Sequence, residues 1–401
     1  MTDDTDVSAR TIGTRIQELR TIRGFSLSEL GRRAHVSAPQ LSRIERGQRY
    51  ATPGVVASVA RALGVGEAVL RGQPYITMLQ KDRLDAMLAP ISSALDSWDL
   101  PPDGEPPPRP LEVLEAETAR IVRLRVRTEF AAIAEELPGL IVESALLTQL
   151  HGRSGRNQER AYSVQAEVAR TAAIVAYRMG YMDLSRLALS RMAVAAPQSG
   201  DKRHVAVERY ERAQITHAEG SRPDRAVALM RLALRDLDDD GERATRAVRG
   251  TLQLRAAMMA AKQCDASGLA DWLGQAGELA AVTGETNDYA MAFGPLNVAL
   301  NEMAAASSQD DHVRALEHAA RVRLPQGYPP TRAAGFWIGK AKSEVWTARL
   351  DDALVSLRKA KQEAPQLTRY HPEVHETVGT LLRARGKAPD PLREFARWSG
   401  V

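Results

Sequence analysis

Residues 26–47 constrain the fold most, because their pattern predicts two short helices joined by a tight turn. The Ser26 hydroxyl can accept a hydrogen bond from a free amide in the first turn of the first helix. Ser37 can cap the second helix in the same way, and Pro39 falls in its first turn, where the missing N–H is not needed. Gly47 is predicted to end this helix in a left-handed conformation.

The second helix of this pair has one apolar face and one polar face. The inward positions are Leu30 and Ala34 in the first helix and Leu41 and Ile44 in the second. The outward positions are small near the N-terminus and long and basic farther along: Ser37, Ala38, Pro39, Gln40, Ser42, Arg43 and Arg46. A helix with such a face can enter the major groove of DNA.

The segment 12–70 resembles the XRE family of helix-turn-helix regulators, which is akin to the lambda-type repressors. The residues that carry the resemblance are Gly24-Phe25-Ser26, Ser28-Glu29-Leu30, Leu41 to Gly47 and Ala60 to Val65. It implies a five-helix DNA-binding domain over residues 11–73 and a bridge between Arg20 and Glu45. Leu27 stands where the family usually has a glutamine that touches DNA.

The outward face and the resemblance together predict a set of DNA contacts. They are Ser26, Ser37, Ala38, Pro39, Gln40, Ser42, Arg43, Arg46, Arg49 and Thr52. Among them, Arg43 is predicted to read a base edge, and Arg46 and Arg49 to contact phosphates. The alternative is a helical hairpin that binds no nucleic acid.

The net excess of positive charge lies in the same part of the chain. Residues 10–72 contain eleven arginines, no lysine and four acidic residues, a net charge of +7, whereas the whole chain carries only +4. A basic segment on an otherwise slightly acidic chain is expected where one module meets phosphate.

No stretch predicts a membrane span, a signal peptide or a disulfide. Runs of about 18 apolar residues do not occur, and the N-terminus is acidic and polar. We therefore expect a cytoplasmic protein that does not contact membranes. Cys264 is the only cysteine and is predicted to be buried rather than redox-active.

Between the two predicted domains lies a linker over residues 74–110, and residues 1–10 are predicted to be disordered. Residues 75–98 form an amphipathic stretch, which predicts either a packed spacer helix or a dimerisation element. Residues 100–110 contain six prolines and predict a semi-rigid linker or an arm that lies on the surface.

From residue 111 to 401 paired helices recur, and their second helices resemble tetratricopeptide repeats. The small residues expected at helix-packing sites are Ala188, Ala226, Ala270, Ala315 and Ala353. Ser185, Ala226 and Ser267 follow one another at a spacing of 41 residues. The whole chain is thus predicted to be all-α, with a solenoid of degenerate repeats for sensing and dimerisation, or alternatively an ordinary helical bundle.

No constellation of residues predicts catalysis, a metal site or a cofactor. The chain has no phosphate-binding loop, no HExxH motif and no paired cysteines. Asp238, Asp239 and Asp240 precede Gly241 and predict a solvated loop. We therefore expect a protein that is not an enzyme and that uses no cofactor.

Candidate ligand contacts lie on the repeats. Asn297 and Asn301 are four apart and share a helix face, and a side-chain amide offers both a donor and an acceptor to a peptide backbone. The layout resembles peptide-sensing regulators of Gram-positive bacteria, in which asparagines of such helices do this. Alternatively, both asparagines bond to neighbouring helices. The flanking aromatic residues are Tyr289, Phe293, Trp337 and Trp346.

These patterns predict a dimeric, sequence-specific transcription regulator that binds a double-stranded operator. Its repeats would sense an effector, a peptide first and a small metabolite second. The rival interpretation is an interaction scaffold, in which the repeats bind a protein partner and the N-terminal domain only tethers it to DNA.

Overall fold

The computed structural model describes residues 4–49, 51–63, 65, 70, 78–97, 107–150, 155–220, 223–384 and 389–400. Over these residues the chain is built from helices, and the one β-type contact among them is an isolated antiparallel bridge between Thr286 and Phe293. The predicted all-α class is confirmed. None of the described helices is both long and apolar enough to span a membrane.

The first four helices form a compact unit, here called the head: α1 (Asp4–Ile22), α2 (Leu27–Ala34), α3 (Ala38–Glu45) and α4 (Pro53–Leu63). The predicted caps are confirmed, because Ser26 accepts from the Glu29 amide and Ser37 from the Gln40 amide. Gly47 follows α3 with a φ of +69°. The fifth helix, predicted over residues 66–71, lies outside the described residues except at Leu70.

Helix α1 begins at Asp4, inside the stretch 1–10 for which the sequence predicts disorder, and that disorder stays a prediction. A sequence that opens on acidic residues suits the first turn of a helix, where negative charge is stabilised by the helix dipole. The acidic, polar composition was therefore compatible with a helix start as well as with disorder.

The core of the head joins α1 to the helix-turn-helix pair. It contains the predicted inward residues, together with Ile12, Ile16, Leu19, Val56, Val59 and Leu63. Gly13 of α1 lies so close to α3 that an added Cβ would be 1.9 Å from the Ile44 carbonyl oxygen. Arg20 of α1 donates to both carboxylate oxygens of Glu45, at 2.7 and 2.8 Å. The bridge implied by the family resemblance is thus present.

Helix α6 (Met78–Asp96) packs against the helices that follow it, and against α8 and α10 in particular. Its buried residues, among them Leu84, Leu88, Ile91 and Leu95, belong to the same core as those helices. Of the two interpretations left open for this stretch, the structure has the packed helix. The linker predicted over residues 74–110 therefore contains an element of the following domain.

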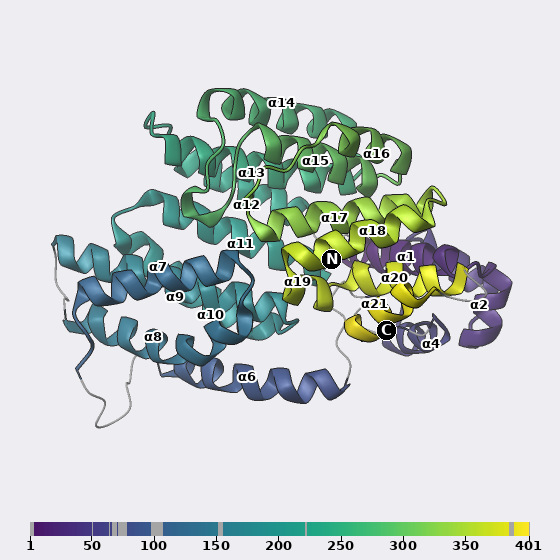
Figure 1. Ribbon diagram of the computed structural model, residues 1–401, viewed down its shortest axis with the longest axis horizontal. Coiled ribbons are helices and arrows are strands. Elements are labelled where there is room, and N and C mark those ends of the chain that lie inside the picture. Colours follow the sequence, from purple (N-terminus) through teal and green to yellow (C-terminus); the bar gives the residue numbers. More distant parts are fainter. Residues whose placement is uncertain are drawn as a thin grey trace.

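The remaining helices, with α6, form a second unit, here called the helical domain. They are α7 (Leu111–Val126), α8 (Phe130–Leu150), α9 (Arg156–Arg178), α10 (Met182–Ala195), α11 (Lys202–Gly220), α12 (Pro223–Asp236), α13 (Arg243–Lys262), α14 (Ala266–Thr283), α15 (Pro295–Ser308), α16 (His312–Arg321), α17 (Pro330–Trp346), α18 (Leu350–Glu363), α19 (Pro365–Tyr370), α20 (Pro372–Ala384) and α21 (Asp390–Ser399). Short 3₁₀ turns follow α10 and α14 (Ala196–Ser199 and Asp288–Ala290). Successive helices from α9 to α18 pack as neighbouring pairs (Figure 1).

The small residues predicted at helix contacts are fully buried in four pairs, at Ala188, Ala226, Ala315 and Ala353. Ala270 is exposed, so the prediction is wrong for α14, where Ala276 and Ala280 are buried instead. The reason is register: the buried stripe of α14 begins farther along the helix than a constant 41-residue spacing requires. Cys264, predicted to be buried, is exposed in the turn between α13 and α14.

The array of helices curves back on itself. The Phe130 amide at the start of α8 donates to the Gln366 side chain of α19 at 3.0 Å. Just beyond α19, helix α20 lies beside α1 of the head (Figure 1). This closure encloses a space that is lined by α1 of the head, by α8 and α9, and by α17, α19 and α20.

Candidate DNA-binding surface and effector cavities

Helix α3 presents the side chains that the sequence assigned to DNA. Leu41 and Ile44 are fully buried and hold the helix to the core of the head. Seven of the ten predicted contacts are exposed, namely Ser26, Ser37, Pro39, Arg43, Arg46, Arg49 and Thr52, and the other three, Ala38, Gln40 and Ser42, are half-buried.

Some polar side chains of this surface already form hydrogen bonds within the head, and others do not. The hydroxyls of Ser26 and Ser37 accept the capping hydrogen bonds, and Arg46 Nε donates to the Ser42 carbonyl oxygen at 3.2 Å. The Arg43 and Arg49 side chains make no hydrogen bond or ion pair with any described residue. These two guanidinium groups therefore have all their donors available for a ligand.

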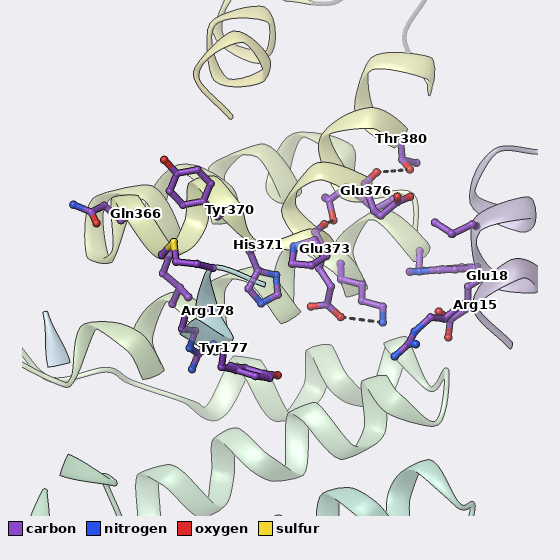
Figure 2. A pocket seen from close by; sticks show the side chains of 18 of the residues that line it. Arg15, Glu18, Tyr177, Arg178, Gln366, Tyr370, His371, Glu373, Glu376 and Thr380 are labelled. Carbon is purple, nitrogen blue, oxygen red and sulfur yellow. Dashed lines mark hydrogen bonds and ion pairs between the residues drawn. The ribbon is translucent and has the colours of Figure 1, made fainter. Parts of the chain in front are cut away.

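A cavity of about 430 Å³, here called the interface cavity, lies between the head and the helical domain. Arg15, Glu18 and Leu19 of α1 form one wall, and the facing wall comes from α17, α19 and α20 (Figure 2). Phe130, Tyr177, Trp346 and Tyr370 also line it, beside Gln366 and His371. Aromatic walls with a few polar groups in a volume of this size are typical of a ligand site.

One ion pair joins the head to the helical domain beside the interface cavity, and a second lies within the helical-domain wall. Arg23, just after α1, lies 4.0 Å from Glu376 of α20, and Lys342 of α17 lies 3.4 Å from Glu373. The Glu373 carboxylate raises the pKa of Lys342, whereas burial raises the pKa of Glu18 and of Glu376. The head thus rests on a poorly hydrated, charged surface whose balance a ligand can change.

A second cavity of about 240 Å³, here called the arginine cavity, adjoins the first, because Phe130, Tyr177 and Arg178 line both. Its walls come mainly from α9, α11, α13 and α17. Five arginine side chains line it: Arg125, Arg170, Arg178, Arg255 and Arg332. Glu211 is the one carboxylate among its lining residues in the described part of the chain.

A strained turn closes one side of the arginine cavity. Tyr289, Ala290 and Ala292 have φ values of +55°, +52° and +44°, a region that residues other than glycine rarely adopt. Arg170 donates to the Tyr289 carbonyl oxygen at 2.6 Å and Arg332 to that of Met291 at 2.9 Å. Two arginines of the cavity therefore hold this turn in place.

The predicted ligand residues lie outside both cavities. Asn297 is buried and its Nδ2 donates to the Ala292 carbonyl oxygen at 2.7 Å, while Asn301 Nδ2 donates to the Asn297 carbonyl oxygen at 2.8 Å. Phe293 is buried, and the Tyr289 hydroxyl bonds to Asp201. Their role in ligand binding stays a prediction, although the contacts seen here are structural ones.

The aromatic residues on α17 divide between structure and cavity. Trp337 packs against Phe336, with ring centroids 4.9 Å apart, and the Lys359 ammonium lies over its ring at 4.3 Å. Trp346 lines the interface cavity and stacks on His312 at 5.2 Å. Of the flanking aromatic residues singled out in the sequence, Trp346 is thus the one placed at a cavity.

The arginine cavity was missed, although the sequence holds a signal for it. Arg170 bonds to Glu211, and Gln214 bonds to Arg255, and the two residues of each pair are 41 positions apart. This is the spacing that the second helices of the pairs show. Applied to the first helices, it would have aligned these polar residues on one face.

Comparison with known proteins gives a family model that matches part of the chain, and solved structures that resemble it at low TM-scores. No curated protein matches the chain. A structure of Bacillus thuringiensis PlcR in complex with the peptide PapR7 and DNA is 15% identical, with a TM-score of 0.29 over 68% of this chain and 95% of the other. The apo form of the competence regulator ComR from Streptococcus vestibularis is 13% identical, with a TM-score of 0.17 over 63% of this chain and 99% of the other. The model of a helix-turn-helix domain matches residues 11–71, so the head, α1 to α4, is a helix-turn-helix domain.

Proposed function

We propose that this protein is a DNA-binding transcription regulator whose helical domain senses an effector. The head would bind an operator through α3, and two copies of the chain would bind together, since one recognition helix spans only a few base pairs. A peptide is our first choice of effector and a small metabolite the second. DNA as the partner would place the protein in the cytoplasm.

One observation carries the proposal: α1 of the head is itself a wall of the interface cavity. The same helix is joined to α3 by the Arg20–Glu45 bridge and by the close approach at Gly13. A ligand in the cavity would therefore touch an element that is rigidly connected to the DNA-binding helix. Such a ligand shifts DNA affinity by the difference in its affinity for the two arrangements, typically about 1 to 3 kcal/mol.

The cavity also has the polar groups that an effector needs. His371 has a buried ring nitrogen, Nδ1, with no hydrogen-bond partner among the described residues, and it faces the cavity together with Tyr177 and Glu373 (Figure 2). A buried polar atom left in this state costs free energy that a bound ligand can recover. These features favour a sensor over a scaffold that only tethers a partner.

The test is footprinting of the purified full-length protein on the promoter of its own gene, with and without extract of the producing cells. We expect the protein to protect two half-sites. Adding extract should change the protein concentration that this protection requires. Tyr370→Ala, which alters the cavity wall and leaves α3 untouched, should keep the footprint and lose the response. Arg43→Ala is the matched control, which should need more protein for the footprint itself and keep the response to extract.

An affinity for the operator that extract never changes would contradict sensing and favour the scaffold. If the protein protects none of the duplexes selected for binding, the whole proposal is contradicted.

A further inference from the structure

The arginine cavity contains more positive charge than its carboxylates neutralise. Arg125 donates to Glu167 at 2.6 Å, and Arg170 lies 3.0 Å from Glu211 and 3.5 Å from Glu167. These two arginines, which are 4% and 2% exposed, thus share Glu167, and Arg170 also pairs with Glu211. Buried charges of opposite sign are paired here as folded proteins require.

The other three arginines of the cavity have no such partner. Arg178, Arg255 and Arg332 form no ion pair with any described residue. Arg255 donates to the Gln214 side chain at 2.9 Å and stacks over the Tyr210 ring at 4.3 Å, and its Nε is buried without a hydrogen-bond partner among the residues described. Arg332 donates to a backbone carbonyl oxygen.

Arg178 is the least favourably placed of the three. It is half-buried, and burial together with the nearby Arg332 guanidinium lowers its pKa. Its ring contact is with Tyr177, 5.8 Å from the guanidinium carbon to the centroid. Like charges held together away from water cost stability unless a counter-charge joins them.

We propose that the arginine cavity is a binding site for an anionic ligand, whose carboxylate or phosphate group is held by Arg178, Arg255 and Arg332. Guanidinium groups offer planar pairs of N–H donors that match the oxygens of both anions. The ligand supplies the charge that the cavity lacks. The proposal deepens the proposed function, because Arg178 also lines the interface cavity, where α1 forms a wall.

The apolar residues of the wall indicate the chemical character of the rest of the ligand. Phe130, Ile174, Tyr177, Ile215 and Met291 line the cavity beside the arginines. A compact anion with an aromatic or aliphatic body fits this lining, whereas a fully polar anion leaves it uncovered. Such a ligand is either a small organic acid or the C-terminal end of a short peptide, and both present the same carboxylate.

Direct binding tests the site without DNA. The full-length protein is titrated by calorimetry with phenylacetate and phenyl phosphate, and with phenylacetamide as the matched neutral compound. A leucine tripeptide is used as the free acid and as the C-terminal amide. We expect the anionic member of each set to bind at least about tenfold more tightly than its neutral partner, as hydrogen bonds to charged groups are strong.

Two variants separate a binding role from a structural one. Arg178→Met should weaken binding of the best anionic probe at least about tenfold and leave the unliganded protein as stable as before or more stable, since it removes a half-buried charge that has no ion pair among the described residues. A structural arginine would instead lower the melting temperature when replaced. Arg314→Gln, on the exposed side of α16, is the control and should change neither measurement.

The outcomes decide the two proposals separately. Equal affinity for charged and neutral probes, or a loss of stability without loss of binding in Arg178→Met, overturns the anion site. Tight binding of the free acid with no change in operator affinity keeps the anion site and overturns its coupling to the head. Preference for the tripeptide over phenylacetate identifies a peptide as the source of the carboxylate, and the reverse order identifies a small acid.

Discussion

The Arg20–Glu45 bridge is expected to hold α1 and α3 together as one rigid unit. The two side chains are 15% and 5% exposed, so the carboxylate of Glu45 is well shielded from water. Arg20→Met would remove two charge-assisted hydrogen bonds and a third to the Phe25 carbonyl oxygen, and would leave Glu45 buried without its partner. Losing one member of a buried pair costs about 3 kcal/mol. The equilibrium for opening of the head should then rise roughly 100-fold.

Hydrogen exchange of the α3 backbone amides in the full-length protein measures this opening directly. Arg20→Met should reduce protection at Leu41 and Ile44 by about two orders of magnitude, and Arg20→Met combined with Glu45→Met should recover most of it, because an apolar pair of similar size carries no uncompensated charge. Arg32→Met is the control, because Arg32 is 74% exposed in its pair with Glu29. Its effect should stay below about 1 kcal/mol.

The reasoning about the bridge is refuted if Arg20→Met lowers protection no more than Arg32→Met does. That result would mean that the bridge behaves as a solvated surface pair despite its burial. Equal loss in the single and double variants would refute a different step, namely that the stranded carboxylate is the main source of the cost.

Three further predictions concern the head. Gly13→Ala should destabilise it by about 1 to 3 kcal/mol in thermal unfolding, since the new Cβ collides with α3, whereas Gly54→Ala, which has open space around it, should be neutral or stabilising. In binding assays on substituted duplexes, Arg43→Ala should cost about 1 to 3 kcal/mol at one operator position. Arg46→Ala should instead weaken binding to all duplexes alike and flatten its salt dependence. Equal losses for both variants on every duplex would contradict the base-reading role of Arg43. Footprints should show two half-sites about 34 Å apart, and a strictly monomeric protein at binding concentrations would rule this out.

The head could be predicted closely because its signals are local. Ser26, Ser37 and Gly47 act on backbone atoms a few residues away, so the sequence pattern around them already contains both partners. The apolar residues of α3 likewise reveal their face through helical spacing alone.

The cavities could not be predicted in this way, because each wall comes from helices that are distant in the sequence. Arg178 and Arg332 become neighbours only once the array of helices has closed on itself, and no local spacing encodes that closure. The asparagine pair shows the same limit. A shared helix face is a local property, but whether Asn297 points to solvent or into the protein depends on the turn before α15, to whose Ala292 carbonyl oxygen it donates.

The position of α20 beside α1 has a consequence for how the protein is made (Figure 1). The head is synthesised early, and its core is formed by residues close in sequence, so it can fold while the ribosome is still translating the helical domain. Glu373 and Glu376 are added only near the end of translation. Every newly made chain would thus pass through a stage in which a folded head is not yet in contact with α20. A chain cut short before α20 would keep that state permanently, and under the proposed function it would bind DNA without responding to an effector in the interface cavity.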